Sequence, residues 1–292
     1  EPFEGLFTQG MVLHESYKDD AGKWLYPEEV DRQPDGPALH VKTRRPIEVG
    51  RKEVMSKSKK NVVPPARIIE TYGADTARWF VLSDSPPERD VIWTEEGVQG
   101  SWRFVQRLWR LIGEIAEIAG RAPTERPVSF GEPALAVRKA AHVALSKVSE
   151  DIEKLRFNRC VAHIYEFANA LGQAIGAVSS PSALTPDFAF AMREAGDILV
   201  QLFAPMMPHL AEECWAALGH KELVSMQPWP KVEAALLVEN TVTLPVQVNG
   251  KVRGRIIVSA GLGAAEFEAA ARAEVEKSAE LQRHLTGRAV LK

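Results

Sequence analysis

The feature that most constrains this chain is a series of apolar stripes at helical spacing between residues 94 and 220. In the first stripe, Val98, Trp102, Val105 and Trp109 recur every three or four residues, which places them on one face of a helix. Each such face must be buried against a neighbour, so several of them joined by short connections predict a helical bundle. Further helices are expected over 145–155, 161–178, 195–203 and 208–218.

Residues with known positional preferences mark the ends of these helices. Gly120 is expected to end the first helix, Asn158 to cap the third and Pro208 to open the last. Apolar periodicity at this spacing is mainly a packing signal. We therefore predict that Trp102 and Trp109 lie in the core of the bundle.

The composition is that of a soluble globular protein. Of the 292 residues, 45% are hydrophobic and 26% are charged, which argues against disordered, collagenous and membrane classes. At about 150 residues per domain, this length predicts two or three domains. Cys160 and Cys214 lie in apolar surroundings without metal-ligand spacing, which predicts buried thiols, no metal site and a reducing, cytoplasmic compartment.

The C-terminal end predicts a small α+β domain, residues 241–292. Two runs rich in Val, Ile and Thr flank Asn249-Gly250, which is a strong signal for a β-hairpin. A helix is expected over 264–285, and residues 288–291 resemble the start of another strand, so we expect this domain to be truncated. Residues 226–240 contain Gln-Pro-Trp-Pro and are predicted to be a linker.

Residues 42–60 stand apart by their charge. They hold eight Lys and Arg side chains against Glu48 and Glu53, a balance of 8 − 2 = +6 in a chain of net charge −3. Such a stretch is a footprint for phosphate, although a solvated basic loop has the same pattern. The centre, Met55-Ser56-Lys57-Ser58-Lys59-Lys60-Asn61, sets ammonium groups beside small hydroxyls. Lysine suits phosphate, and fixed positive charge stabilises a transition state that gathers charge on phosphoryl oxygens.

Several motifs carry a resemblance to a known family. The basic centre resembles Lys-Met-Ser-Lys-Ser, the second signature of class I aminoacyl-tRNA synthetases, and residues 72–78 match the family's Tyr-Gly-Ala-Asp-x-x-Arg. Residues 202–215 are similar to the Pro-x-x-Pro-His-x-x-Glu-Glu-x-Trp segment of the leucine, isoleucine and valine enzymes. Thr8–Leu13 and Val246–Arg253 point to bacterial-type leucyl-tRNA synthetases, and the resemblance covers essentially the whole chain.

The resemblance implies a multidomain, mainly α fold. Residues 1–90 would be the C-terminal part of a Rossmann-like α/β catalytic domain, with the signature loop at 54–61 and a short insertion at about 17–53. Residues 91–225 would form a helical, anticodon-binding-type domain. Residues 241–292 would be a C-terminal tRNA-binding domain.

The resemblance also implies a reaction for the intact enzyme. ATP, with Mg²⁺, would activate leucine as leucyl-adenylate, which would then be transferred to tRNA(Leu). Lys57 matches the catalytically important second lysine of the signature and would stabilise charge on the departing pyrophosphate. The implied ATP-binding residues are Met55, Ser56, Lys57, Ser58 and Lys59.

Basic residues elsewhere are candidate contacts to tRNA phosphates. Arg103 and Arg107 flank the first apolar stripe on its polar side, and Lys251, Arg253 and Arg255 follow the hairpin turn. Each of them could equally meet only water. Nothing in the sequence indicates an obligate dimer, so a monomer is expected.

Two departures from the family pattern limit what this chain can do alone. Val54 stands where the first signature lysine would be, and the family's other signature, His-Ile-Gly-His, is not found in the chain. We therefore expect a C-terminal portion that does not form leucyl-adenylate by itself. The alternatives are a fragment of isoleucyl-, valyl- or methionyl-tRNA synthetase, and an RNA-binding module without chemistry.

Three residues of the motifs have simpler interpretations. Asp75 and Arg78 are three apart on an expected helix and could form only a surface pair. His209 follows Pro208 at a helix start, where a packing or capping role is favoured over catalysis.

Overall fold

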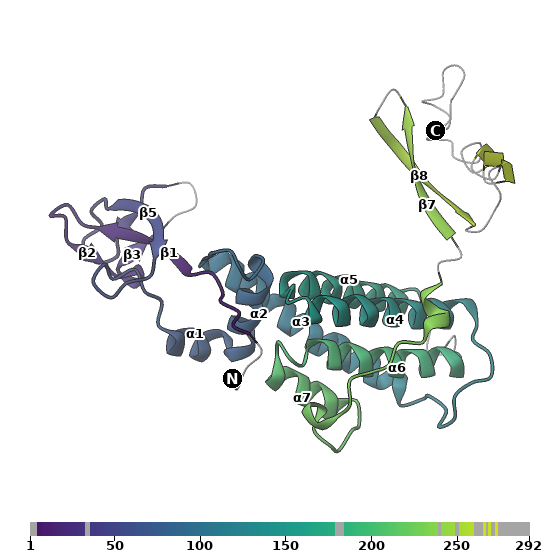
Figure 1. Cartoon of the computed structure of the whole chain (residues 1–292). Helices are drawn as coiled ribbons and strands as arrows, with labels where there is room; N and C mark the ends of the chain where they lie inside the picture. Colours follow the sequence, from purple (N-terminus) through teal and green to yellow (C-terminus); the bar gives the residue numbers. More distant parts are fainter. Residues whose placement is uncertain are drawn as a thin grey trace. The chain divides into compact units, whose positions relative to one another are not determined.

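The computed structural model describes residues 5–32, 36–178, 184–238, 241–248 and 251–259, together with 265–266, 268–269 and 272–273. The chain divides into two compact units, Glu1–Val232 and Glu233–Lys292 (Figure 1). Each unit is described by itself. Among the described residues, no helix combines the length and apolar character needed to cross a bilayer.

The first unit begins with a small mixed sheet. Strand β1 lies centrally, with β2 and β5 antiparallel on either side and β6 paired to it in parallel. A separate two-stranded ribbon is formed by β3 and β4. Residues 19–46 contain the short strands β2, β3 and β4. The bounds are β1 Val12–Lys18, β2 Trp24–Leu25, η1 Pro27–Glu29, β3 Val30–Asp31, β4 Leu39–His40, β5 Glu48–Val54 and β6 Val91–Ile92.

Two short helices connect this sheet to the rest of the unit. Helix α1 (Pro65–Tyr72) ends at Gly73, whose φ of 83° suits glycine, and α2 (Ala74–Asp84) follows immediately. The helix expected to carry Asp75 and Arg78 is α2. A small core of Ile68, Phe80, Val91, Trp93 and Val98 joins the end of the sheet to α1, α2 and the start of the next helix.

The five expected amphipathic helices are confirmed. Helices α3 to α6 run alongside one another (Figure 1), and α3 opens at Thr94, whose hydroxyl accepts the Gly97 amide at 3.2 Å. Asn158 was wrongly predicted as a cap, because α5 begins at Phe157 and Arg156 holds the capping position. The bounds are α3 Glu95–Ala119, α4 Glu132–Glu153, α5 Phe157–Gly176, α6 Pro186–Phe203 and α7 Pro208–Ala217.

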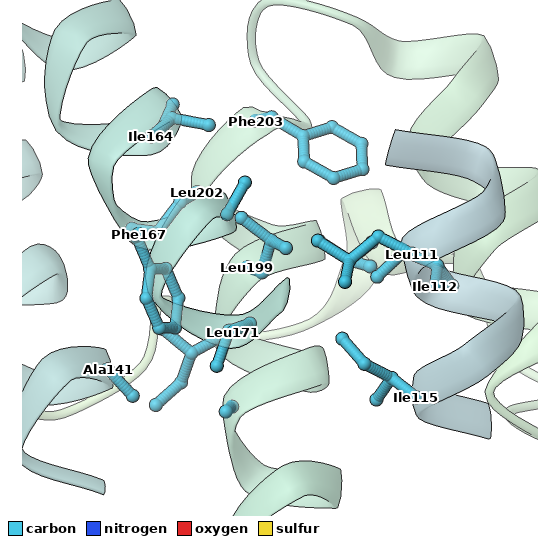
Figure 2. Packing of buried hydrophobic residues seen from close by; sticks show 14 of the residues in the cluster. Leu111, Ile112, Ile115, Ala141, Ile164, Phe167, Leu171, Leu199, Leu202 and Phe203 are labelled. Carbon is cyan, nitrogen blue, oxygen red and sulfur yellow. The ribbon is translucent and has the colours of Figure 1, made fainter. Parts of the chain in front are cut away.

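The bundle encloses one large apolar core. In Figure 2, Ile112 of α3, Leu171 of α5 and Leu199 of α6 point toward one another, and all three are fully buried. Close approach of α3 and α6 depends on Gly196, where a β-carbon would lie 2.8 Å from the Ile115 side chain. Burial of aliphatic side chains, at roughly 1.5–3 kcal/mol each, is the main stabilisation of this unit.

The two tryptophans of the first stripe lie elsewhere than expected. Trp102 and Trp109 are 39% and 46% exposed, whereas Phe104 and Leu108 occupy the core. The prediction that these tryptophans belong to the core is therefore wrong. The buried face of α3 is rotated from the predicted one, which leaves the tryptophans at its solvent edge.

The second unit contains a β-hairpin, as the sequence predicted. Strand β7 (Thr241–Val248) pairs antiparallel with β8 (Lys251–Ser259), and the short helix η4 (Ala234–Leu237) precedes them. Gln247 is paired with Val252 and Val246 with Gly254, so Arg253 is the extra residue of a β-bulge. The Asn249-Gly250 turn, most of the helix expected over 264–285 and the strand expected at 288–291 lie outside the described residues.

A buried charge pair connects two helices of the bundle. Arg138 of α4 is only 2% exposed and donates from its guanidinium Nε to Glu194 of α6 at 2.6 Å. Burial opposes ionisation of Glu194, but hydrogen bonds from His142 and Arg138 prevail and lower the pKa of its carboxyl to about 2. A carboxyl with a lower pKa in the folded state stabilises the fold above its unfolded pKa, and this stability is lost as the pH falls toward the folded value.

We expect the free energy of unfolding to fall as the pH is lowered from about 5 to 2, partly through Glu194. Glu194→Gln should lower that free energy at pH 6 by roughly 1–3 kcal/mol, because hydrogen bonds to a charged group are lost, and should flatten its dependence on pH. Urea titrations at several pH values measure both effects. Glu117→Gln, at an exposed site on α3, is the control. An unchanged pH profile in Glu194→Gln would contradict this assignment.

Candidate functional site

The basic stretch forms a compact loop after β5. Residues 54–61, here called the Ser/Lys loop, leave the sheet beside β1, where the Met55 amide lies 3.4 Å from the carbonyl oxygen of Val12. Two turn hydrogen bonds shape the loop, from the Lys59 amide to Ser56 and from the Lys60 amide to Lys57. Lys60 takes a φ of 56°, in the left-handed region, as the loop reverses.

The side chains predicted to bind ATP have different surroundings. Met55 packs against the small core, and the hydroxyls of Ser56 and Ser58 lie 2.7 Å apart. Lys59 forms an ion pair with Glu53, and hydrogen bonds from Lys59 and Ser16 lower the pKa of that carboxyl. Lys57 is exposed, and its ammonium group makes no hydrogen bond or ion pair with any described residue. It is therefore the loop ammonium most accessible to a ligand.

Acidic and aromatic partners neutralise part of the basic stretch. Arg44 pairs with Asp31 at 2.5 Å and Arg45 with Asp20 at 2.9 Å, and the Lys60 ammonium lies 4.8 Å from the centre of the Tyr26 ring. Within the described ranges, the basic residues of this stretch without a salt-bridge partner are Lys42, Arg51, Lys52, Lys57 and Lys60. The positive charge is therefore concentrated on β5 and the Ser/Lys loop.

A polar pocket of about 250 Å³ lies between the Ser/Lys loop and the sheet. Ser16, Lys18, Glu53 and Lys59 contribute to its lining. Gly50 also lines the pocket, and a β-carbon there would lie 2.5 Å from the Ser16 hydroxyl, so glycine leaves room for this nearly buried serine. Lys59 thus faces the sheet, on the inner side of the loop.

Asp75 and Arg78 join α2 to the turn between α6 and α7. Asp75, only 7% exposed, accepts the Leu210 amide at 2.6 Å and lies 2.9 Å from the ring nitrogen Nδ1 of His209. The Arg78 guanidinium donates to the carbonyl oxygens of Pro205 and Met206, at 2.8 and 2.9 Å. The two side chains therefore bind the start of α7 instead of forming a surface pair with each other. The His209 side chain is 77% exposed and contacts Asp75, and Asp75 accepts the amide at the start of α7, so the packing or capping role expected for His209 is wrong.

The rest of the α7 motif also has structural partners. Glu212 accepts the backbone amides of Val224 and Ser225, at 2.8 and 3.1 Å, and so fixes the short helix η3 (Val224–Met226). Trp215 stacks on His220, with ring centres 3.7 Å apart, and Cys214 is fully buried. These contacts explain the motif through packing and helix-end hydrogen bonds.

The predicted tRNA-binding residues fall into two groups in different compact units. Arg103 and Arg107 lie on α3, and neither forms a salt bridge with a described residue. Trp102 and Trp109 lie on the same helix and are partly exposed. The other group, Lys251, Arg253 and Arg255, lies on β8, where the structure describes the backbone.

Sequence reasoning missed two residues of the Ser/Lys loop region, Asn61 and Glu53. Asn61 is fully buried, and its amide bonds both the start of the loop and the neighbouring strands. Its position at the end of the loop was the only signal in the sequence. Glu53 was counted as a charge, although its ion pair with Lys59 determines which loop lysine remains exposed.

Comparison with known families agrees with this fold and loop. Residues 136–268 match the family described as the anticodon-binding domain of tRNA ligase, and residues 47–94 match tRNA synthetases class I (I, L, M and V). The second match contains the Ser/Lys loop, α1 and α2. The chain is therefore homologous to part of the class I tRNA synthetases.

Among the class I tRNA synthetases, two individual relatives that match this chain are leucine–tRNA ligases. The chain is 54% identical to the leucine–tRNA ligase of Azorhizobium caulinodans and 58% identical to that of Nitrobacter hamburgensis. Each match covers 92% of this chain and 31% of the relative, so the chain spans about a third of their length. The predicted resemblance to the C-terminal portion of leucyl-tRNA synthetases is confirmed, and the isoleucine, valine and methionine alternatives are not favoured.

A solved structure shows the same fold. A LeuRS of Agrobacterium radiobacter K84, crystallised as a ternary complex with tRNA and LeuAMS, matches all of this chain over 32% of its own, with a TM-score of 0.65 and 24% identity. The mainly helical class I fold that was predicted is thus confirmed at this level.

We expect Asp75→Ala to lower the free energy of unfolding by roughly 1–3 kcal/mol, because the Leu210 amide loses its acceptor at the buried start of α7. Asp84→Ala, at the exposed end of the same helix, should have little effect. Urea unfolding followed by circular dichroism compares the two. Equal stability of the two variants would show that the α2–α7 contact contributes little.

Proposed function

We propose that this chain is the C-terminal part of a leucine–tRNA ligase and that the intact enzyme uses ATP to join leucine to tRNA(Leu). The main support is the 54–58% identity to leucine–tRNA ligases over 92% of the chain, which includes the Ser/Lys loop. By itself the chain would lack the other family signature and would not form leucyl-adenylate. We also propose that the intact enzyme is monomeric and cytoplasmic.

In the first step, a leucine carboxylate oxygen would attack the α-phosphorus of ATP, and the bond to pyrophosphate would break. Negative charge then grows on the leaving pyrophosphate. Lys57, whose ammonium group is exposed and has no ion-pair partner among the described residues, would stabilise that charge. Met55, Ser56, Ser58 and Lys59 would shape the loop and add polar contacts to ATP.

The Ser/Lys loop offers groups that suit phosphate oxygens better than a metal ion. Its side chains are ammonium groups and hydroxyls, and the neighbouring carboxylate of Glu53 is paired with Lys59. Mg²⁺ is a hard cation that prefers oxygen ligands, above all carboxylates and phosphates. We therefore propose that Mg²⁺ arrives with ATP and that this chain contributes positive charge.

For the second step, the helical bundle and the β-hairpin would bind tRNA(Leu). The support is the match to an anticodon-binding domain and the two arginines of α3, of which Arg103 is exposed and Arg107 is half-buried. Contacts to phosphate position a protein on RNA without reading its sequence. The proposed phosphate contacts are Arg103, Arg107, Lys251, Arg253 and Arg255.

In the intact synthetase, Lys57→Ala should slow leucine-dependent ATP–pyrophosphate exchange by about 10²–10³-fold, the usual cost of removing one transition-state donor. The affinity for tRNA(Leu) should not change. Lys42→Ala removes another exposed lysine without a salt-bridge partner in the described ranges and should leave exchange unaffected. Normal exchange in Lys57→Ala would falsify the role proposed for Lys57.

Arg103→Ala should weaken binding of this chain to tRNA(Leu) and lower the slope of log K against log salt by roughly one unit or less, because one phosphate contact is lost. Titrations at several salt concentrations measure this slope. Arg89→Ala removes an exposed arginine between α2 and β6 and serves as the control. An identical slope in the two variants would exclude α3 from the tRNA contact.

A further inference from the structure

Asn61 is a polar residue with none of its surface exposed. Its side-chain oxygen accepts the Ser56 amide at 2.8 Å. Its side-chain nitrogen lies 3.3 Å from the carbonyl oxygen of His14 and 3.4 Å from those of Glu53 and Val54. A buried amide with all these contacts has its hydrogen-bonding capacity satisfied, which is the condition for burying it without a large penalty.

These partners come from three separate places. His14 lies on β1, Glu53 and Val54 are the last two residues of β5, and Ser56 is the first residue of the turn in the Ser/Lys loop. Asn61 itself lies where the loop ends. The Asn61 side chain therefore connects the end of the Ser/Lys loop to its start and holds both ends against the sheet. Lys57 is the next residue after the tethered Ser56.

We propose that Asn61 is a positioning residue for the adenylation reaction, because it fixes the base of the Ser/Lys loop and so sets where the Lys57 ammonium meets phosphate. This inference rests on the proposed function. Asn61 acts through Lys57 and has no contact of its own with ATP.

The chemistry of the tether requires an asparagine. The side chain must accept from the Ser56 amide and also donate toward carbonyl oxygens of His14, Glu53 and Val54. Aspartate has the same shape but, when ionised, can only accept, so its second oxygen would face those carbonyls. Serine is too short to span both sides. Either substitution should weaken the hydrogen bonds at the base of the loop, while the Lys57 ammonium group itself is retained.

The second tether of the loop has a different character. Lys59 and Glu53 form an ion pair with side chains 39% and 15% exposed. Ion pairs this open to solvent hold weakly. The loop therefore has a buried, neutral attachment at its base through Asn61 and a weaker, charged attachment through Lys59.

A double-mutant cycle in the intact synthetase tests the proposal. Asn61→Asp and Asn61→Ser are each combined with Lys57→Ala, and ATP–pyrophosphate exchange, tRNA(Leu) affinity and thermal unfolding are measured. Asn61→Asp should slow exchange by about 10–100-fold, the scale expected when a reacting group is misplaced by about 1 Å. In the Lys57→Ala background the same change should alter exchange by less than about threefold, because the two residues act as one unit.

The control is Asn169→Asp, which makes the same change at an exposed site on α5 and should leave exchange unaffected. Losses that multiply in the double variant would overturn the proposal, because Asn61 would then act independently of Lys57. Unfolding or lost tRNA affinity in both Asn61 variants would also overturn it, by showing a structural role alone. Absence of leucine-dependent exchange in the unaltered synthetase would refute the proposed function itself, so this failure is distinguishable from failure of the role proposed for Asn61.

Discussion

The first compact unit depends on the fact that α2 belongs to two cores at once. Trp79 is fully buried in the core of the helical bundle, whereas the next residue, Phe80, packs in the small core beside the sheet. Adjacent residues on a helix point about 100° apart, so one short helix can face both cores. Asp75 and Arg78 add polar contacts to the α6–α7 turn. The small core beside the sheet and the core of the bundle are therefore connected through α2.

The helices were predictable because their apolar periodicity is local information. All five helices of the bundle were predicted. Apolar periodicity does not, however, determine accurately which face of a helix is buried. On α3, Trp102 and Trp109 fit an apolar stripe, but Phe104 and Leu108 are the residues that face the core. A tryptophan tolerates a half-exposed edge because its ring is apolar while its N–H can meet water.

Long-range partners could not be predicted from one sequence. Asp75 and Arg78 have helical spacing, which suggested a pair, yet their partners lie more than 120 positions along the chain. The Ser/Lys loop was recognised from its motif, and residue types suggested a phosphate site. The sequence could not show what each side chain of the loop contacts. Lys59 pairs with Glu53, Met55 packs against the small core, and Asn61 binds the base of the loop.

The two cysteines have a further consequence for studying this chain. Both are fully buried, and burial raises the pKa of Cys160 to about 11 and that of Cys214 to about 12. Since the thiolate is the reactive form, neither group is a nucleophile at neutral pH. The sequence contains no other cysteine. A single cysteine introduced on the surface would then be the one thiol open to labelling, and a spectroscopic probe could be attached without removing either native residue.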